Sequence, residues 1–389
     1  MPFISAGDGD LKSVFITDVN LIDRFVGNRL FAWGYNYSGE LGDNTTTNRS
    51  YPIQTIAFGN NWSFVSGGGI NTAAIKTDGT LWIWGYNYYG QLGDNTRTSK
   101  SSPIQTITGG TNWKTVVCGL SNISTFTAAI KTDGTLWLWG RNSWGQLGDN
   151  TLTHRSSPVQ VVGFASTWSS VSCGSDHAAA IKTDGTLWNW GQNFNGRLGD
   201  NTLIHKSSPI QTVALGTNWK QVSCGAYFTA AIKTDGTLWM WGQGNNGQLG
   251  TNTITHRSSP IQTVALGTNW NSVACGYYHT AAIKTDGTLW TWGLNTNGQL
   301  GDNTITSKSS PIQTITGGNN WSSVTCGSAH TAAIKTDGTL WNWGLNSFGQ
   351  LGDNTTTNKS SPVQTLLRVN NWKRVSAGYY NTAAVTYGD

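Results

Sequence analysis

Three cysteine–histidine pairs with one common spacing are the residues whose types could do chemistry in this sequence. The pairs are Cys173 with His177, Cys275 with His279, and Cys326 with His330. Thiolate and imidazole groups are common zinc ligands, but a zinc site needs about four of them. Each pair falls in a different copy of a repeat, and Asn71, Phe228 and Asn381 take the histidine position in other copies. We therefore predict no metal site, and histidines that hydrogen-bond to backbone within their own unit.

The cysteines occupy one equivalent position in five units of the repeat. They are Cys118, Cys173, Cys224, Cys275 and Cys326. Gly67 and Ala377 stand at this position in the other two units. A position shared by Cys, Gly and Ala is typical of tight packing, and equivalent positions in separate units are too far apart for disulfides. These residues are predicted to be buried, free and structural thiols.

Carboxylates show no catalytic pattern. The aspartates recur in Asp-Gly and Asp-Asn-Thr turns, and the single glutamate is Glu40. Turn chemistry explains such aspartates, and their spacing is not that of a calcium loop. No glycine-rich phosphate loop precedes a helix. The sequence thus predicts a protein that is not an enzyme and that carries no catalytic residue, metal or cofactor.

One stretch positions all these residues. Ala-Ala-Ile-Lys-Thr-Asp-Gly-Thr-Leu-Trp-x-Trp-Gly first occurs at 73–85 and is found in six nearly identical copies. A degenerate copy of its second half lies at 30–34, and the matching first half lies at 381–386. Six complete copies and one copy divided between the termini make seven units. Such a fixed period indicates one continuous repeat body.

Each unit is predicted to form four short strands. In the unit beginning at Asn218, apolar strands at 218–225 and 229–233 precede an Asp-Gly hairpin, a third strand at 238–241, a long loop and a fourth strand. The richness in Gly, Thr, Asn and Trp also favours strands over helices. We predict an all-β, seven-bladed β-propeller of four-stranded antiparallel blades, closed by a blade split between the N- and C-termini.

The repeat also resembles a known family. The segments 273–283 and 324–334, with the trailing Trp-Gly-x-Asn-x-x-Gly-Gln-Leu-Gly, are similar to the regulator-of-chromosome-condensation repeat. The resemblance covers roughly residues 28–389 and implies a seven-bladed propeller with a split closing blade. Residues 1–27 lie outside the period and are apolar. They are predicted to be either a flap over the ring or a segment that docks it to a larger assembly.

The distribution of charge disfavours nucleic acid as a partner. Only 11% of residues are charged, and the net charge of +5 arises from basic residues repeated once per unit. Such charges form rings rather than the one-sided patch of a DNA-binding face. No run could span a bilayer, and residues 1–10 lack the apolar core of a secretory signal. The predicted location is a virion or the medium after lysis.

Differences among the copies concentrate in two loops, which antiparallel strands should place on one face. The variable positions are rich in aromatic residues and include the only insertion, within 120–126. The aromatic candidates are Tyr35, Tyr37, Tyr86, Tyr88, Tyr89, Trp144, Phe194, Tyr227, Phe228, Tyr277, Tyr278, Phe348, Tyr379 and Tyr380. Diverse loops on a uniform scaffold are typical of a recognition surface, although part of this set could simply pack at the channel mouth.

These features predict a non-enzymatic binding or structural module that recognises a protein or a glycan through the variable face. In its low charge and near-identical repeats, the chain is similar to virion-associated proteins of phages, such as a fibre, an adhesin or a decoration protein. The family resemblance implies two alternatives, a guanine-nucleotide exchange factor for a small GTPase and a protein inhibitor of an enzyme. The insertion carries no acidic residue at 120–123, which disfavours the exchange factor.

Overall fold

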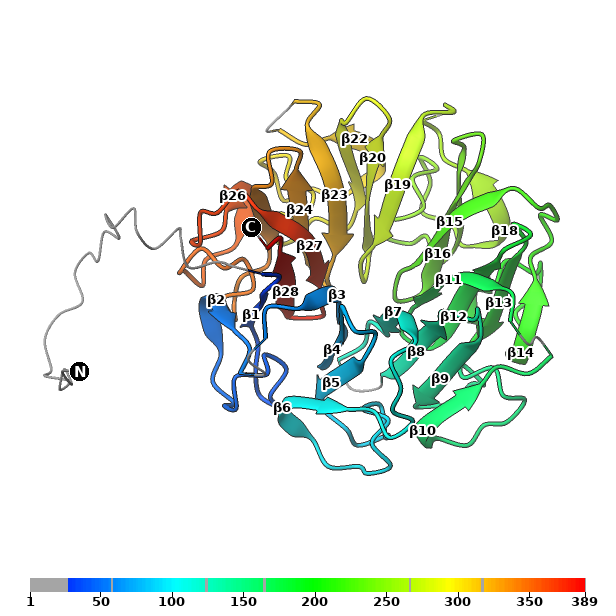
Figure 1. Ribbon diagram of the computed structural model, residues 1–389. Helices are drawn as coiled ribbons and strands as arrows, with labels where there is room; N and C mark the ends of the chain where they lie inside the picture. Colours follow the sequence, from blue (N-terminus) through cyan, green and yellow to red (C-terminus); the bar gives the residue numbers. More distant parts are fainter. Residues whose placement is uncertain are drawn as a thin grey trace, which may run out of the picture.

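The computed structural model describes residues 27–388, except 57–58, 123–124, 164–165, 266 and 316–317. In this part of the chain, seven four-stranded antiparallel sheets form a ring (Figure 1). The predicted all-β propeller is therefore confirmed. Of the segment 1–27, predicted to be a flap or a docking segment, residues 1–26 lie outside the described residues.

Six blades are built from consecutive strands. The first two are β3 (Trp62–Gly67), β4 (Asn71–Lys76), β5 (Leu81–Gly85), β6 (Lys100–Gln105) and β7 (Trp113–Cys118), β8 (Phe126–Lys131), β9 (Leu136–Gly140), β10 (Arg155–Gln160). The next two are β11 (Trp168–Cys173), β12 (His177–Lys182), β13 (Leu187–Gly191), β14 (Lys206–Gln211) and β15 (Trp219–Cys224), β16 (Phe228–Lys233), β17 (Leu238–Gly242), β18 (Arg257–Gln262). The last two are β19 (Trp270–Cys275), β20 (His279–Lys284), β21 (Leu289–Gly293), β22 (Lys308–Gln313) and β23 (Trp321–Cys326), β24 (His330–Lys335), β25 (Leu340–Gly344), β26 (Lys359–Gln364). The only described helix is a 3-10 turn, η2 (Phe194–Gly196).

The closing blade joins the two ends of the chain. Its order is β2-β1-β28-β27, in which the outer strands are β1 (Leu30–Gly34) and β2 (Arg49–Gln54) and the inner strands are β27 (Trp372–Ala377) and β28 (Asn381–Thr386). Figure 1 shows blue β1 beside dark red β28. Five residue pairs hold this seam, including Phe31 with Ala384. The pairing leaves neither strand as a free edge that could recruit another chain.

The hydrophobic core lies between the blades rather than inside one layer. A typical cluster packs Phe228 and Met240 of one blade against Trp270, Val273 and Trp292 of the next. The second strand of each of the six consecutive blades, and β28 of the closing blade, carries a pair of alanines. Their small side chains leave room for these rings. Each fully buried tryptophan removes a large apolar surface from water, which holds neighbouring sheets face to face.

A shared carbonyl joins each blade to the next. Trp84 Nε1 and Thr72 Oγ1, both of the blade β3–β6, donate hydrogen bonds of 2.8 Å to the backbone oxygen of Glu40 in the closing blade. The tryptophan bond recurs at all seven junctions. The Leu-Trp-x-Trp-Gly strand is constant because its last tryptophan is both a core residue and this donor.

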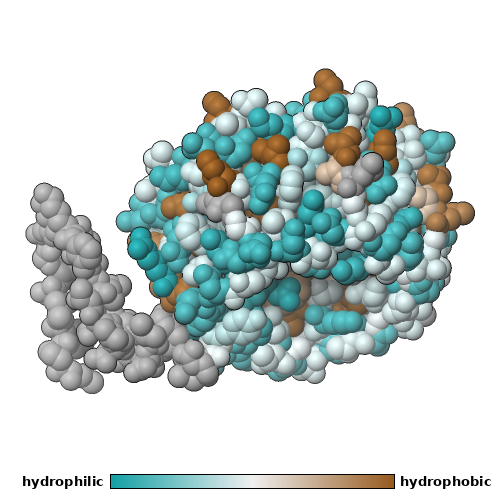
Figure 2. Space-filling view, turned by 90° about the horizontal axis from the view of Figure 1, so that it is seen from above, coloured by the Kyte–Doolittle hydropathy of each residue, from teal (hydrophilic) through white to brown (hydrophobic). Residues whose placement is uncertain are grey.

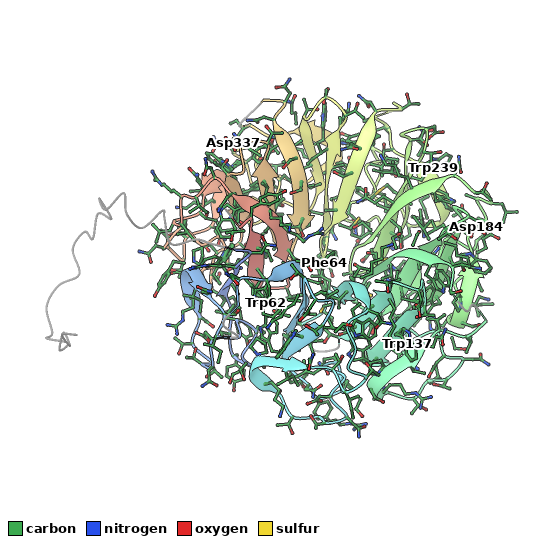
Figure 3. The ribbon with its side chains drawn as sticks, viewed as in Figure 1. Trp62, Phe64, Trp137, Asp184, Trp239 and Asp337 are labelled. Atoms are coloured by element: carbon green, nitrogen blue, oxygen red, sulfur yellow. The ribbon has the colours of Figure 1, made fainter. Side chains whose placement is uncertain are left out.

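The Asp-Gly turns form a second constant layer. Lys284 Nζ lies 5.0 Å from the ring of Trp270 and 4.4 Å from that of Trp290, and Trp290 Nε1 donates to Thr288, which donates to Asp286. Figure 3 shows the same elements in other blades, with Trp137, Trp239, Asp184 and Asp337 outward of Phe64. These polar groups bind one another, which explains why the turns vary so little.

Candidate functional site

The two variable loops of each blade emerge on one face of the ring. The inner loop joins the first strand to the second, and the outer loop joins the third strand to the fourth. The Asp-Gly turns and the connections between blades lie at the opposite face, as the bond from Trp219 N to Gly185 O shows. We call the face with the variable loops the aromatic face and the face with the Asp-Gly turns the turn face. The face assignment made from sequence follows from the antiparallel strand order.

A closed circle of backbone hydrogen bonds supports the inner loops. Each inner loop donates to the inner loop of the next blade, for example Gly69 N to Gly119 O at 2.9 Å and Tyr277 N to Gly327 O at 3.2 Å. The circle closes where Tyr379 N donates to Gly68 O at 2.9 Å. Side chains on these loops therefore start from fixed backbone positions, as a preorganised binding surface requires.

Eight aromatic residues form one continuous chain of ring contacts, which we call the central belt, and five of them lie on these inner loops and three on outer loops. In order along the contacts, its members are Tyr37, Tyr35, Phe348, Tyr380, Tyr379, Tyr277, Tyr278 and Tyr227. Tyr379 and Tyr380 are 4.4 Å apart between ring centroids, and Tyr277 and Tyr379 are 5.3 Å apart. Because most pairs meet edge to face, the rings also stabilise one another.

Two smaller clusters extend the aromatic surface over other blades. Tyr88 contacts both Tyr86 and Tyr89, and the ring of Tyr89 lies 5.1 Å from that of His154. The second cluster joins Trp144, Phe194 and His205, with centroid distances of 4.7 to 5.5 Å. The two loop histidines accept backbone N–H bonds through Nδ1, and burial is the main cause that lowers the pKa of each.

A charged group lies between the aromatic clusters. Asp176 forms an ion pair with Arg141, whose guanidinium also lies 5.8 Å from the ring of Tyr89. Arg197 is 2% exposed and lies 4.9 Å from the ring of Tyr227 in the central belt. Burial raises the pKa of the Asp176 carboxyl, although Arg141 and Arg197 both oppose this shift. Two cations and one anion give this part of the face a net positive charge.

Sequence reasoning did not select Arg141, Asp176 or Arg197. The signal was present, since Arg197 takes the place of the glutamine found in Gly-Gln-Leu-Gly in most other units. The structure brings these three residues together because they come from neighbouring loops of adjacent blades.

The candidate aromatic residues differ widely in accessibility. Tyr37, Tyr88 and Phe194 are exposed by 76%, 60% and 49%, whereas Tyr379 is 9% exposed. Phe228 is 0% exposed and belongs to the core between two blades. The prediction of Phe228 as a binding residue is therefore corrected, because its side chain is not accessible to a ligand. Phe228 opens the second strand of its blade, so its side chain points into the sheet packing and not to the loop surface.

The buried histidines bind side chains of the neighbouring blade, which corrects the predicted backbone bonds. His177, His279 and His330 each lie 2.9 to 3.0 Å, through Nε2, from a threonine hydroxyl of the next blade. That hydroxyl donates onward to the shared carbonyl, as Thr331 does to Gln299. The histidine must then donate, so its proton resides on Nε2. Burial lowers the pKa of His279 and His330 to about 3.

The five cysteines are buried and free, as predicted. Burial raises the pKa of Cys118, Cys224 and Cys326 to about 12, so the reactive thiolate is rare at neutral pH. Within the described ranges, no three His, Cys, Asp or Glu side chains converge to hold a metal ion. The same ranges contain no helix that could cross a lipid bilayer.

The insertion packs into the surface at its described positions. Leu120 and Ser121 are each 6% exposed, and Ser175 Oγ of the next blade donates a 2.6 Å hydrogen bond to the carbonyl oxygen of Leu120. Asn122 is exposed. Leu120 and Ser121 thus reinforce the circle of inner loops rather than project from the face.

The fold and this face define a class of protein, a closed seven-bladed repeat propeller that presents diverse loops on one side of a uniform scaffold. Comparison with known proteins identifies the family. A model of the RCC1-like domain matches residues 165–388, and models of the regulator of chromosome condensation (RCC1) repeat match 28–75, 78–127, 133–181 and 62–91. The chain belongs to the RCC1 repeat family.

Individual relatives agree with this assignment. The chain is 31% identical over 329 residues to the ultraviolet-B receptor UVR8 of Arabidopsis thaliana, covering 83% of this chain and 74% of UVR8. It is 30% identical over 282 residues to the mitochondrial RCC1 domain-containing protein RUG3 of the same plant, covering 70% of this chain and 63% of RUG3. These similarities point to binding or regulation.

Solved structures show the same fold at lower identity. Human WBSCR16 superimposes with a TM-score of 0.81 and 22% identity, covering 93% of this chain and 99% of that structure. Prp20p of Saccharomyces cerevisiae gives a TM-score of 0.81 and 18% identity, covering 94% and 92%.

Proposed function

We propose that this chain is a non-catalytic binding module and that the aromatic face contacts a protein partner. The central belt carries the proposal, because eight aromatic rings from loops of different blades form one connected surface, and five of them lie on the inner loops that the circle of backbone hydrogen bonds holds. Aromatic anchors of this kind dominate the binding energy of many protein interfaces. The net positive group of Arg141, Asp176 and Arg197 beside the belt adds a charged contact.

The relatives support a protein as the ligand class. Prp20p was studied for its binding to Gsp1p and histones, and yeast RCC1 (Prp20) has been crystallised with Kap60. A glycan remains the competing ligand, since carbohydrates also stack on aromatic rings. The virion-associated setting, as a fibre, adhesin or decoration, is proposed on the low charge and near-identical repeats alone. Regulation of a small GTPase is the competing regulatory role.

The test compares variants matched in exposure on opposite faces. Tyr37→Ala with Tyr88→Ala removes the two most exposed aromatic side chains of the aromatic face. Leu215→Ala is the control, because Leu215 is 72% exposed on a connection at the turn face. Proteins captured from lysate by the immobilised chain are identified by mass spectrometry, and glycans are screened on an array.

We expect one protein to bind the native chain and the Leu215→Ala control equally and the double variant at least about tenfold more weakly, with the same melting temperature. Equal capture by all three chains would overturn the role of the aromatic face. Binding to glycans alone would replace the protein partner with a glycan. Accelerated nucleotide release from a small GTPase would replace it with the exchange-factor alternative.

A further inference from the structure

The outer loops of six blades contain the same internal carboxylate site. In the closing blade, Asn36 Nδ2 donates to Asp43 at 3.0 Å, Thr45 donates to the same carboxylate, and Arg49 reaches it through Nε at 3.1 Å and Nη2 at 2.8 Å. Asn142, Asp149 and Arg155 repeat this arrangement. In other loops a lysine replaces the arginine, with Nζ 3.7 to 4.0 Å from the aspartate.

The loop between β17 and β18 has lost the acidic half of this site. Gly244 replaces the asparagine and Thr251 replaces the aspartate. A Cβ on Gly244 would collide with the carbonyl oxygen of Thr255, so the loop has closed over the asparagine position. The hydroxyls of Thr251, Thr253 and Thr255 bond to one another instead, at 2.9 and 3.1 Å.

The basic half of the site remains. Arg257 is the counterpart of Arg49 and Arg155, yet its Nε is buried with no hydrogen-bond partner. Among the described residues, none forms an ion pair with Arg257. An enclosed guanidinium N–H without an acceptor is unfavourable, and the planar fork of arginine matches carboxylate and phosphate groups. Neither Nη group of Arg257 is among the buried unpaired atoms. A carboxylate from outside the chain can therefore approach these groups and supply the anionic partner that Arg49 and Arg155 have internally.

The loop that precedes Arg257 also exposes apolar surface. Ile254 on this loop is 66% exposed and lines a pocket of about 280 Å³ together with Asn246, Ser307 and Lys308. The adjacent blades expose Leu203 and Ile305 at corresponding loop positions, by 62% and 67%. Figure 2 shows exposed apolar residues as separate brown patches on a mainly polar surface. A partner segment can thus pair an acidic side chain with a neighbouring aliphatic one.

We propose that the loop between β17 and β18 binds an aspartate or glutamate side chain of a protein partner through Arg257, with the exposed Ile254 of the same loop contacting an aliphatic neighbour of that residue. This inference rests on the proposed protein-binding role of the aromatic face, on whose outer loops the site lies. It is nevertheless tested without the partner, by small probes that carry the two recognised groups.

The probes are N-acetyl-Leu-Glu-amide and its uncharged analogue N-acetyl-Leu-Gln-amide, with inorganic phosphate as a second anion, all at constant ionic strength. The readout is the Nε–H resonance of Arg257 in the full chain labelled with ¹⁵N-arginine. We expect a saturable shift with the glutamate probe and none with the glutamine probe. The resonances of Arg49 and Arg155 should not move, because their carboxylates are already in place.

Two variants complete the test. Thr251→Asp reinstates the internal carboxylate and should abolish the response. Arg257→Lys keeps the charge, as at Lys308, but loses the fork and should bind the probe about tenfold more weakly. Because this variant has no Arg257 resonance, its affinity is compared with that of the native chain by isothermal titration calorimetry. Equal shifts at Arg49, an equal effect of the glutamine probe, tighter binding of phosphate, or an unchanged response in Thr251→Asp would each overturn the proposal. If Tyr37→Ala with Tyr88→Ala leaves partner capture intact while Arg257 responds, only the proposed function fails.

Discussion

Trp33 and Thr382 donate hydrogen bonds to the same acceptor, the backbone oxygen of Gln350, each at 2.9 Å. The tryptophan comes from β1 and the threonine from β28. At five of the other six junctions both donors come from one continuous blade, as Thr331 and Trp343 do at Gln299. At Gln146 only Trp190 donates, because Ala178 takes the threonine position. The ring therefore closes with the same inter-blade bond that holds its other junctions, and closure needs both ends of the chain at once.

The threonine of this junction donates one hydrogen bond in every blade that has it, and in some blades it also accepts one from a histidine. The same substitution should therefore lower the free energy of unfolding by different amounts in different blades. Thr331 donates to Gln299 and accepts from His279, whereas Thr280 donates to Gln248 and follows a blade that carries Phe228 at the histidine position. Thr280→Val should lower the free energy of unfolding by about 1 kcal/mol. Thr331→Val should lower it by roughly 1–3 kcal/mol more than Thr280→Val does, because the buried Nε2–H of His279 loses its acceptor.

Chemical denaturation of both variants measures the difference. The control is Thr331→Val combined with His279→Phe, which recreates the Phe228 arrangement and should remove the additional loss. Equal losses for the two single variants would show that the histidine bond contributes nothing.

The buried histidines predict acid sensitivity. The folded-state pKa of His279 and His330 is about 3, below the unfolded value, so the unfolded chain binds protons first as the pH falls. Their contribution is fully present above pH about 6.5 and is lost as the pH falls toward 3. Each should lower the free energy of unfolding by about 2 kcal/mol between pH 7 and pH 5.

Replacement by asparagine, the natural residue at positions 71 and 381, supplies the comparison. Urea unfolding of His279→Asn with His330→Asn should show a flatter dependence on pH over this range. A slope identical to that of the native chain would rule out these histidines as its origin.

Glu40 predicts the opposite dependence. It is 1% exposed, its Oε1 has no partner, and burial raises its pKa to about 7. For a carboxyl with a raised pKa, stability is fully present below the unfolded pKa and declines as the pH rises through the folded pKa. Glu40→Gln, which introduces the residue of most other units, should raise the free energy of unfolding by up to about 3 kcal/mol at pH 8 and change it little at pH 4.

Thermal or chemical unfolding at the two pH values provides the measurement. The same gain at both pH values would mean that the charge of Glu40 is not the cause.

The burial of the cysteines predicts that their thiols do not react with thiol reagents in the native state. All five are buried, and burial raises their pKa. A thiol reagent such as Ellman's reagent should modify less than about one thiol per native chain at pH 8 and all five after unfolding. Rapid modification of the native chain would contradict the packing role of this position.

The number of blades, their strand order, the split closure and the burial of the cysteines could be predicted because they follow from local patterns. Each complete unit contains its own turn and strand patterns, such as an Asp-Gly turn between apolar strands. One copy of such a pattern predicts a hairpin only weakly, but six copies at a regular spacing predict the same blade strongly. The face that carries the variable loops followed from antiparallel order alone.

The tertiary structure decided which residues meet across blades. His279 binds Thr331 of the next blade, Phe228 lies in the core, and Arg141, Asp176 and Arg197 gather from neighbouring loops. Repeat periodicity predicts equivalent positions but not the contacts between adjacent units, because those depend on the angle and distance at which one sheet packs on the next. For the same reason, the unpaired Arg257 is visible only against the carboxylate sites that the other loops complete.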